Sequence, residues 1–281
     1  MKKIGLVDYF IDEWHSNNYL IWIDEICKQY GYDFKVAYAW AQMPTYEGKM
    51  STQNWCEKNG ITQCETIDEL CEKSDYIMIL APANPETHLE YAKSVLKYKK
   101  NTYIDKTFAP DVKTAEKIFK IAKEYGTLFF STSALRYSNE LDGFENSARS
   151  MIVKGGGRSF EEYCIHQIEM LVKVMKPGAE KVMVFNSGKQ KNCIIKYKDG
   201  RESFLIYSDK SPFSVNIEKN DGTSVYNKID SDYFKNLLKH ILDFFTHGNL
   251  PFESEETLEV IRIRESLIKA IDTPEEWIYI V

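Results

Sequence analysis

Residues 74–96, SDYIMILAPANPETHLEYAKSVL, decide the fold of this chain. The uninterrupted apolar run that begins at Tyr76 predicts a strand buried on both faces, which is typical of a parallel sheet. Asn84 can cap the helix that follows, and Pro85 suits its first position. The apolar residues of that helix recur at helical spacing: Leu89, Ala92, Val95 and Leu96. Strand, turn and helix together indicate one unit of an α/β domain.

The same alternation of strand and helix runs through the first 132 residues. Strands are predicted at 2–7, 33–40, 61–65, 101–106 and 127–133, and helices at 14–31, 66–74 and 111–126. Helices that alternate with strands indicate a parallel sheet covered on both faces. The sequence therefore predicts a Rossmann-like, doubly wound parallel sheet in a domain of residues 1–132.

The pattern changes after residue 132. Helices are predicted at 137–157, broken by its glycine triplet, and at 160–175, 232–248 and 254–272, the last capped by Ser254. Strand-like runs lie at 181–190, 192–208 and 213–227, joined by turn signals that indicate antiparallel hairpins, and the second and third runs each contain an Asp-Gly turn. The prediction for residues 133–281 is an α+β domain with an open, mostly antiparallel sheet.

Composition excludes several classes of function. The net charge is −6, with both signs interspersed and no basic block, so neither nucleic acid nor an anionic membrane is an expected partner. No run approaches the roughly 20 apolar residues of a membrane span, and Asp8 and Asp12 interrupt the place of a signal sequence, which favours the cytoplasm. The six cysteines lack a CxxC spacing and the five histidines form no HExxH, so no metal site is expected.

Four segments, taken in order, resemble the glucose–fructose oxidoreductase, inositol dehydrogenase and MocA (Gfo/Idh/MocA) family. In residues 74–96 the matching residues are Pro82, Asn84 and His88. In residues 102–137, Asp105, Lys106 and Thr107 stand in the places of the family's Glu-Lys-Pro motif, and Arg136 follows. Residues 155–171 contain the glycine triplet, Glu162 and His166, and residues 248–270 resemble the closing helix. The resemblance implies a dehydrogenase that uses NAD or NADP on a secondary alcohol of a sugar, sugar acid or cyclitol. It also implies that residues 133–281 serve substrate binding and oligomerisation, and that the protein is a homo-oligomer, a dimer or tetramer.

The family's chemistry needs a base for the hydroxyl proton and a cation against the oxygen. The resemblance assigns these roles to His166 and Lys106, and makes Glu162, four residues before His166 on a helix, the orienting acid. The family usually has aspartate in that place. The cofactor-binding residues that it implies are Val7, Asp8, Ala81, Pro82, Asn84, His88, Asp105 and Lys106. His88 has an alternative role in packing a helix on the sheet, and the tryptophans could supply a stacking face for a sugar.

The loop after the first strand departs from this family. Asp8, Phe10 and Glu13 fall where its three phosphate-binding glycines would be. A carboxylate about 5 Å from a phosphate charge adds roughly 3 kcal/mol of repulsion. The acid expected after the second strand is also missing, since that strand ends in Trp40 and Ala41. Three alternatives stay open: NAD(P) binding with an altered loop, a ligand-binding or regulatory protein without a dinucleotide, or non-redox chemistry in the same pocket.

Overall fold

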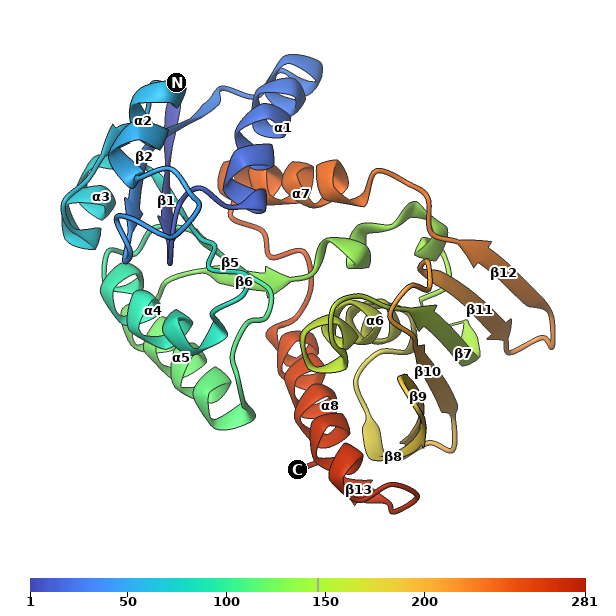
Figure 1. Cartoon of the computed structure of the whole chain (residues 1–281). Coiled ribbons are helices and arrows are strands. Elements are labelled where there is room, and N and C mark those ends of the chain that lie inside the picture. Colours follow the sequence, from blue (N-terminus) through green and yellow to red (C-terminus); the bar gives the residue numbers. More distant parts are fainter. Residues whose placement is uncertain (146) are drawn as a thin grey trace. The chain divides into compact units, whose positions relative to one another are not determined.

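The computed structural model describes residues 1–145 and 147–281, which divide into two compact units (Figure 1). The first comprises Met1–Thr132 and Lys235–Phe252, and the second Ser133–Phe234 and Glu253–Val281. The division after Thr132 coincides with the predicted one, but Lys235–Phe252, expected in the second domain, groups with the first. The reason is apolar packing, because Phe245 stacks on Tyr76 with ring centroids 4.7 Å apart.

Within the described residues, the first unit contains a six-stranded parallel sheet in the order β3-β2-β1-β4-β5-β6. Its strands are β1 (Lys2–Asp8), β2 (Phe34–Ala41), β3 (Thr62–Gln63), β4 (Tyr76–Ile79), β5 (Thr102–Asp105) and β6 (Phe129–Thr132). From β1 the chain adds β2 and β3 on one side and then β4, β5 and β6 on the other, so the strand order switches between β1 and β4. Open α/β sheets bind their ligands beside such a switch point, at the carboxyl ends of the strands. The predicted Rossmann-like sheet is confirmed.

The helices of the first unit mostly follow the predictions. They are α1 (Trp14–Tyr30), α2 (Thr52–Asn59), α3 (Ile67–Lys73), the 3-10 turn η1 (Pro85–Thr87), α4 (His88–Leu96), α5 (Val112–Tyr125) and α7 (Tyr233–His247). Helix α1 ends at Gly31 in the left-handed conformation, φ 74°. Helix α2 was not predicted, because its eight residues carry little apolar periodicity beyond Trp55 and Cys56.

Gly5 in β1 shows how closely helix and sheet approach in this unit. A Cβ atom there would lie 2.4 Å from Ser74 Oγ and 2.5 Å from a methyl group of Leu70. Only glycine fits, so the end of α3 packs directly against β1.

Among its described residues, the second unit has a seven-stranded sheet in the order β12-β11-β7-β10-β9-β8-β13. The strands are β7 (Ala148–Gly155), β8 (Ala179–Ser187), β9 (Gln190–Tyr197), β10 (Glu202–Tyr207), β11 (Ser214–Lys219), β12 (Ser224–Lys228) and β13 (Ile278–Tyr279). All neighbours pair antiparallel except β7 and β10. This confirms the open, mostly antiparallel sheet.

The predicted helix at 137–157 is wrong. The chain forms short 3-10 turns, η2 (Ala134–Tyr137) and η3 (Asn139–Leu141), and then strand β7. Met151 and Val153 are buried while Ile152 and Lys154 are exposed, and this period of two belongs to a strand. Asn146, within the predicted helix, lies outside the described residues.

Helices α6 (Phe160–Met175) and α8 (Ser254–Asp272) pack on this sheet through β7, β10 and β8. Ser254 begins α8 as its first residue, and Glu253, not Ser254, holds the cap position. None of the described helices combines the length and apolar character that a membrane-spanning helix needs. The described part of the chain contains no group of three His, Cys, Asp or Glu side chains placed to hold a metal ion.

Candidate active site

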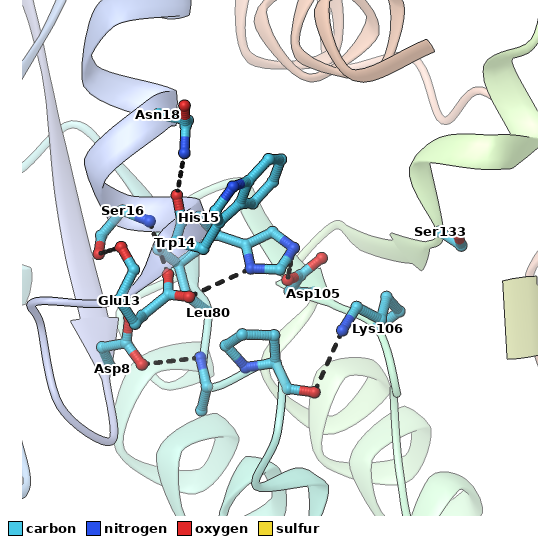
Figure 2. Close-up of polar contacts among 12 residues, drawn as sticks. Asp8, Glu13, Trp14, His15, Ser16, Asn18, Leu80, Asp105, Lys106 and Ser133 are labelled. Carbon is cyan, nitrogen blue, oxygen red and sulfur yellow. Dashed lines mark hydrogen bonds and ion pairs between the residues drawn. The ribbon is translucent and has the colours of Figure 1, made fainter. Parts of the chain in front are cut away.

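Lys106 follows β5 at the carboxyl edge of the first unit's sheet. Its ammonium donates a hydrogen bond to the backbone carbonyl of Pro82, with 3.3 Å between nitrogen and oxygen, and its side chain is half-buried (Figure 2). Two of the predicted cofactor-binding residues therefore meet at this edge. Asn84 lies nearby in sequence and donates to the carboxylate of Glu86 at 3.0 Å.

His88 lies in the interior beneath the same edge. One ring nitrogen contacts the carbonyl oxygen of Leu80 at 2.9 Å, and the other contacts that of Phe108 at 3.0 Å. Burial lowers the pKa of His88, against the opposing effect of these two carbonyls. The ring ties the end of β4 to the loop after Lys106, so His88 positions both loops from within.

Asp8 ends β1 and is 1% exposed. Its Oδ1 accepts hydrogen bonds from the backbone N–H groups of Tyr9 and Ala81, at 2.7 and 3.0 Å. Burial, and then the charge of Glu13, raises the pKa of Asp8 well above its usual value. The preceding Val7 is fully buried, and its carbonyl oxygen accepts a hydrogen bond from the backbone N–H of Leu80.

Glu13 occupies the N-terminus of α1. Its Oε1 accepts from the backbone N–H of Ser16 at 2.6 Å, and its Oε2 lies 3.2 Å from His15 Nδ1. Burial acts to raise the pKa of Glu13, but His15 and the backbone N–H groups of His15 and Ser16 outweigh it and hold that pKa below its usual value. A carboxylate of the chain itself therefore occupies this helix N-terminus.

His15 connects α1 to the end of β5. Its Nε2 lies 3.7 Å from Oδ2 of Asp105, whose Oδ1 accepts from the hydroxyl of Tyr103 at 2.8 Å. Figure 2 shows the ring of His15 between the carboxylates of Glu13 and Asp105. This cluster was not predicted, since His15 is separated from Asp105 by 90 residues of sequence and only the fold brings them together.

His166, on α6 in the second unit, has a described partner that the sequence did not indicate. Its Nδ1 lies 2.6 Å from Oγ of Ser133. The rings of Tyr163 and Phe213 lie beside it, with centroids 5.4 and 6.1 Å away. A hydroxyl on one ring nitrogen and aromatic neighbours fix how the imidazole is oriented.

Glu162 lies one helical turn before His166. The contact described for its carboxylate is an ion pair with Arg158, also one turn away. The side chain of Glu162 is partly exposed, so the pair is a weak one. The orienting role of Glu162 toward His166 stays a prediction.

A buried ion-pair network supports Ser133. The backbone N–H of Ser133 donates to Glu169 at 3.0 Å, and Glu169 pairs with Arg136 at 3.1 Å. Arg136 pairs also with Glu256 of α8, so the network joins η2 to both helices of the second unit. Arg136 therefore acts inside that unit.

The glycine triplet before α6 permits a close approach of backbones. A Cβ atom on Gly156 would lie 1.7 Å from the carbonyl oxygen of Ser208. The loop after β10 thus packs directly on the strand that leads to α6, which explains the glycine without any role in phosphate binding.

The predicted catalytic residues are divided between the units. Lys106 belongs to the first, and Glu162 and His166 belong to the second. The meeting of these three side chains in one pocket stays a prediction. Sequence reasoning missed Ser133 and the cluster around His15, because no helical or strand spacing links these residues.

The residues at the sheet edge fit a nicotinamide dinucleotide only in part. Pro82 and Lys106 lie at the carboxyl edge, where the fold places ligands. The phosphate end does not fit in the usual way, because Glu13 already accepts the N–H of Ser16 that an anion would use, and Asp8 takes that of Ala81.

Residues 35–133 match the Gfo/Idh/MocA family model, described as "Oxidoreductase family, NAD-binding Rossmann fold". The segment of residues 35–133 belongs to the Gfo/Idh/MocA family. The match begins after the loop that contains Asp8 and Glu13. The family predicted from the sequence is confirmed, and it is a family of NAD-binding oxidoreductases.

Individual relatives extend the likeness. "Uncharacterized oxidoreductase YhhX" of Escherichia coli (strain K12) is 32% identical over 60 residues, which cover 21% of this chain and 17% of that protein. GenD2 from gentamicin A biosynthesis, solved in complex with NAD, has a TM-score of 0.77 at 12% identity, covering 100% of this chain and 96% of that one. Apo scyllo-inositol dehydrogenase from Lactobacillus casei has a TM-score of 0.76 at 13% identity, covering 99% and 98%. At such identities the two structures show the shared fold alone.

Proposed function

We propose that this protein is an oxidoreductase that oxidises or reduces a secondary alcohol of a sugar, sugar acid or cyclitol, with NAD or NADP as its hydride partner. The observation that carries the proposal is the 2.6 Å contact between His166 Nδ1 and Ser133 Oγ, which is supported by the buried pair of Glu169 and Arg136. The family of the N-terminal domain and the NAD complex of a structural neighbour support the cofactor. A neighbouring scyllo-inositol dehydrogenase supports the substrate class.

The nicotinamide, when bound, takes up or gives the hydride. The chain's own task is then to move one proton and to stabilise charge on the substrate oxygen. If Nδ1 of His166 carries a hydrogen and donates it to Ser133, Nε2 is left as the basic nitrogen that accepts the hydroxyl proton. Lys106 supplies the positive charge that stabilises an alkoxide-like oxygen.

A second candidate is a family member that has lost the dinucleotide and binds a ligand, regulates, or runs non-redox chemistry. The observation that favours it is the carboxylate of Glu13 at the N-terminus of α1, paired with His15 and Ser16. A phosphate there would meet a negative charge in place of free N–H groups.

Cofactor binding separates the two candidates. Under the first, NAD or NADP raises the melting temperature of the purified protein, and under the second neither does. In the first case, His166→Gln abolishes turnover while the cofactor still raises the melting temperature, and Lys106→Met abolishes turnover. If neither NAD nor NADP raises the melting temperature of the unaltered protein, the oxidoreductase proposal is wrong.

The proposal includes a homo-oligomer formed through the open sheet of the second unit. Phe204, Ile194 and Ile152 are cross-strand neighbours, and each is incompletely buried while the adjoining Leu205, Ile195 and Val153 are fully buried. Alternation places the first three on the face opposite the buried side chains. An apolar face of this kind favours self-association, as a dimer or tetramer. A cytoplasmic location, without nucleic-acid or membrane partners, completes the proposal.

A further inference from the structure

Three buried polar atoms at the carboxyl edge of the first unit's sheet have no hydrogen-bond partner in the part of the chain that the structure describes. They are Oδ2 of Asp8, Oδ2 of Asp105 and the hydroxyl of Tyr19. Asp8 and Asp105 are 1% exposed, and Tyr19 is 0% exposed. Native proteins rarely leave such groups unsatisfied, so three of them in one cluster point to a missing partner.

The three groups belong to one cluster. Tyr19 and Asp105 flank His15, with ring centroids of His15 and Tyr19 5.5 Å apart and His15 Nε2 3.7 Å from the Asp105 carboxylate. The charges of Glu13 and Asp105 both act to raise the pKa of Asp8, and Figure 2 shows Glu13 and Asp105 beside His15, with Asp8 next to Glu13.

Their hydrogen-bonding capacity identifies the missing partner. Oδ1 of Asp8 already accepts two backbone N–H groups, which leaves Oδ2 to act as a donor when the carboxyl is protonated and as an acceptor when it is ionised. Burial favours the protonated form, because it raises the pKa of Asp8. The hydroxyl of Tyr19 is a second donor, and Oδ2 of Asp105 is an acceptor. A hydroxyl group both accepts and donates and can satisfy all three. The pyrophosphate diester of a dinucleotide offers no donor at neutral pH, and any phosphate would be repelled by the negative charges of Asp105 and Glu13.

Trp14 offers an apolar face beside the cluster. Its side chain is 50% exposed, and its ring lies edge-on to His15 with centroids 5.1 Å apart. The side chain of His15 is itself 12% exposed, so the cluster lies just under the surface at this edge. A ligand ring with hydroxyl groups around its edge and apolar faces could stack on the indole of Trp14 while its hydroxyls contact the neighbouring polar groups.

We propose that Asp8, Tyr19 and Asp105 bind the hydroxyl groups of a sugar or cyclitol ring that packs on Trp14, with no phosphate in contact with these three residues. The inference goes beyond the proposed function, because it assigns a binding site to the loop in which the family's glycines are missing. The ring is either the ribose of a nicotinamide nucleotide, with its phosphates displaced outward, or a free sugar or cyclitol. Both present the same vicinal hydroxyls, and different probes distinguish them.

The test is titration calorimetry, with tryptophan fluorescence as a second readout for Trp14. The probes are nicotinamide riboside, a set of myo-inositol and glucose, and inorganic pyrophosphate. We expect the riboside or a member of the sugar set to bind, and pyrophosphate not to bind. Riboside binding identifies the ribose as the ring, and sugar binding identifies the free ligand.

Two variants and one control test the residues. Asp105→Asn should lower the affinity for the probe that binds about 10- to 100-fold, and Tyr19→Phe should lower it about 10-fold. Tyr197→Phe, which alters another buried tyrosine in the second unit, should leave binding unchanged. Circular dichroism verifies that each variant is folded, and Tyr19→Phe keeps the test available if Asp105→Asn does not fold.

The proposal is overturned if no ring probe binds, if pyrophosphate binds as tightly as the ring probes, or if both folded variants bind like the unaltered protein. Its failure is distinguishable from that of the oxidoreductase proposal. Ring binding that depends on Asp105 without any turnover removes the proposed function alone. Turnover without such dependence removes this site alone.

Discussion

Nδ1 of His15 lies 3.2 Å from Oε2 of Glu13, and the other oxygen of that carboxylate caps helix α1 through Ser16. The side chain at the family's third glycine position therefore stabilises its own helix and holds an imidazole. The loop that lacks glycine here is held by the contacts of Glu13 with His15 and Ser16.

Replacing Glu13 by alanine should lower the free energy of unfolding by about 1–2 kcal/mol, because the cap of α1 is lost. Glu13→Gln should lose less, since its amide oxygen still accepts from Ser16. Urea unfolding measures both, with Glu116→Ala on exposed α5 surface as the control. Equal stability of the Ala variant and the control would contradict the cap.

Asp8→Asn tests the buried carboxyl. Burial, and then the charge of Glu13, raises the folded-state pKa of Asp8, so its contribution to stability is full below the unfolded pKa, about 3.9, and is lost as pH rises through the folded pKa. The difference in melting temperature between Asp8→Asn and the unaltered protein should therefore grow in favour of the variant as pH rises above the unfolded pKa, and should level off once pH passes the folded pKa. A difference that stays constant with pH would show that Asp8 ionises normally.

Ser133→Ala should lower kcat about 10-fold or more with little change in KM, because His166 loses the hydroxyl that orients its ring. The pH dependence of kcat should change with it. Ser133→Thr keeps a hydroxyl and should recover most of the activity. Ser147→Ala removes another serine hydroxyl of the second unit and should have no effect; an equal loss in that control would remove the assigned role.

Arg136→Met should destabilise the protein by about 3–5 kcal/mol, since it leaves the buried carboxylates of Glu169 and Glu256 without their cation. Arg149→Met breaks an exposed pair with Glu218 and should cost less than about 1 kcal/mol. Denaturant unfolding compares the two. Similar costs would show that the network is not a structural support.

Phe204→Glu should convert the proposed oligomer to monomer, because it places a charge on the open apolar face. Light scattering after size exclusion measures the mass. Leu128→Glu changes an exposed leucine of the first unit and should leave the mass unchanged. A monomeric unaltered protein, or an unchanged mass for Phe204→Glu, contradicts association through this face.

Local sequence patterns predicted most of the fold. The continuous run at Tyr76 and the terminating glycines Gly31 and Gly126 indicated the parallel sheet and its helices correctly. Strand β7 was misread as a helix because its alternation is short and adjoins polar turns, and α7 was assigned to the wrong unit because the packing of Phe245 on Tyr76 is a long-range contact.

The candidate site was predictable only where a motif is continuous in the sequence. Lys106 lies at the sheet edge as its strand-end position implied, and Glu162 and His166 share helix α6. Ser133 beside His166, and Asp105 beside His15, are contacts between residues 33 and 90 positions apart. No periodicity reports such contacts, because tertiary packing alone creates them.

Transfer of deuterium tests the proposed function most directly. The protein is incubated with NAD or NADP and a set of sugars, sugar acids and cyclitols that carry deuterium on the carbinol carbons, and the recovered cofactor is analysed by mass spectrometry. We expect deuterium on the nicotinamide ring with at least one substrate, and none with His166→Gln. Cofactor that stays free of deuterium with every member of the set would contradict the proposed function.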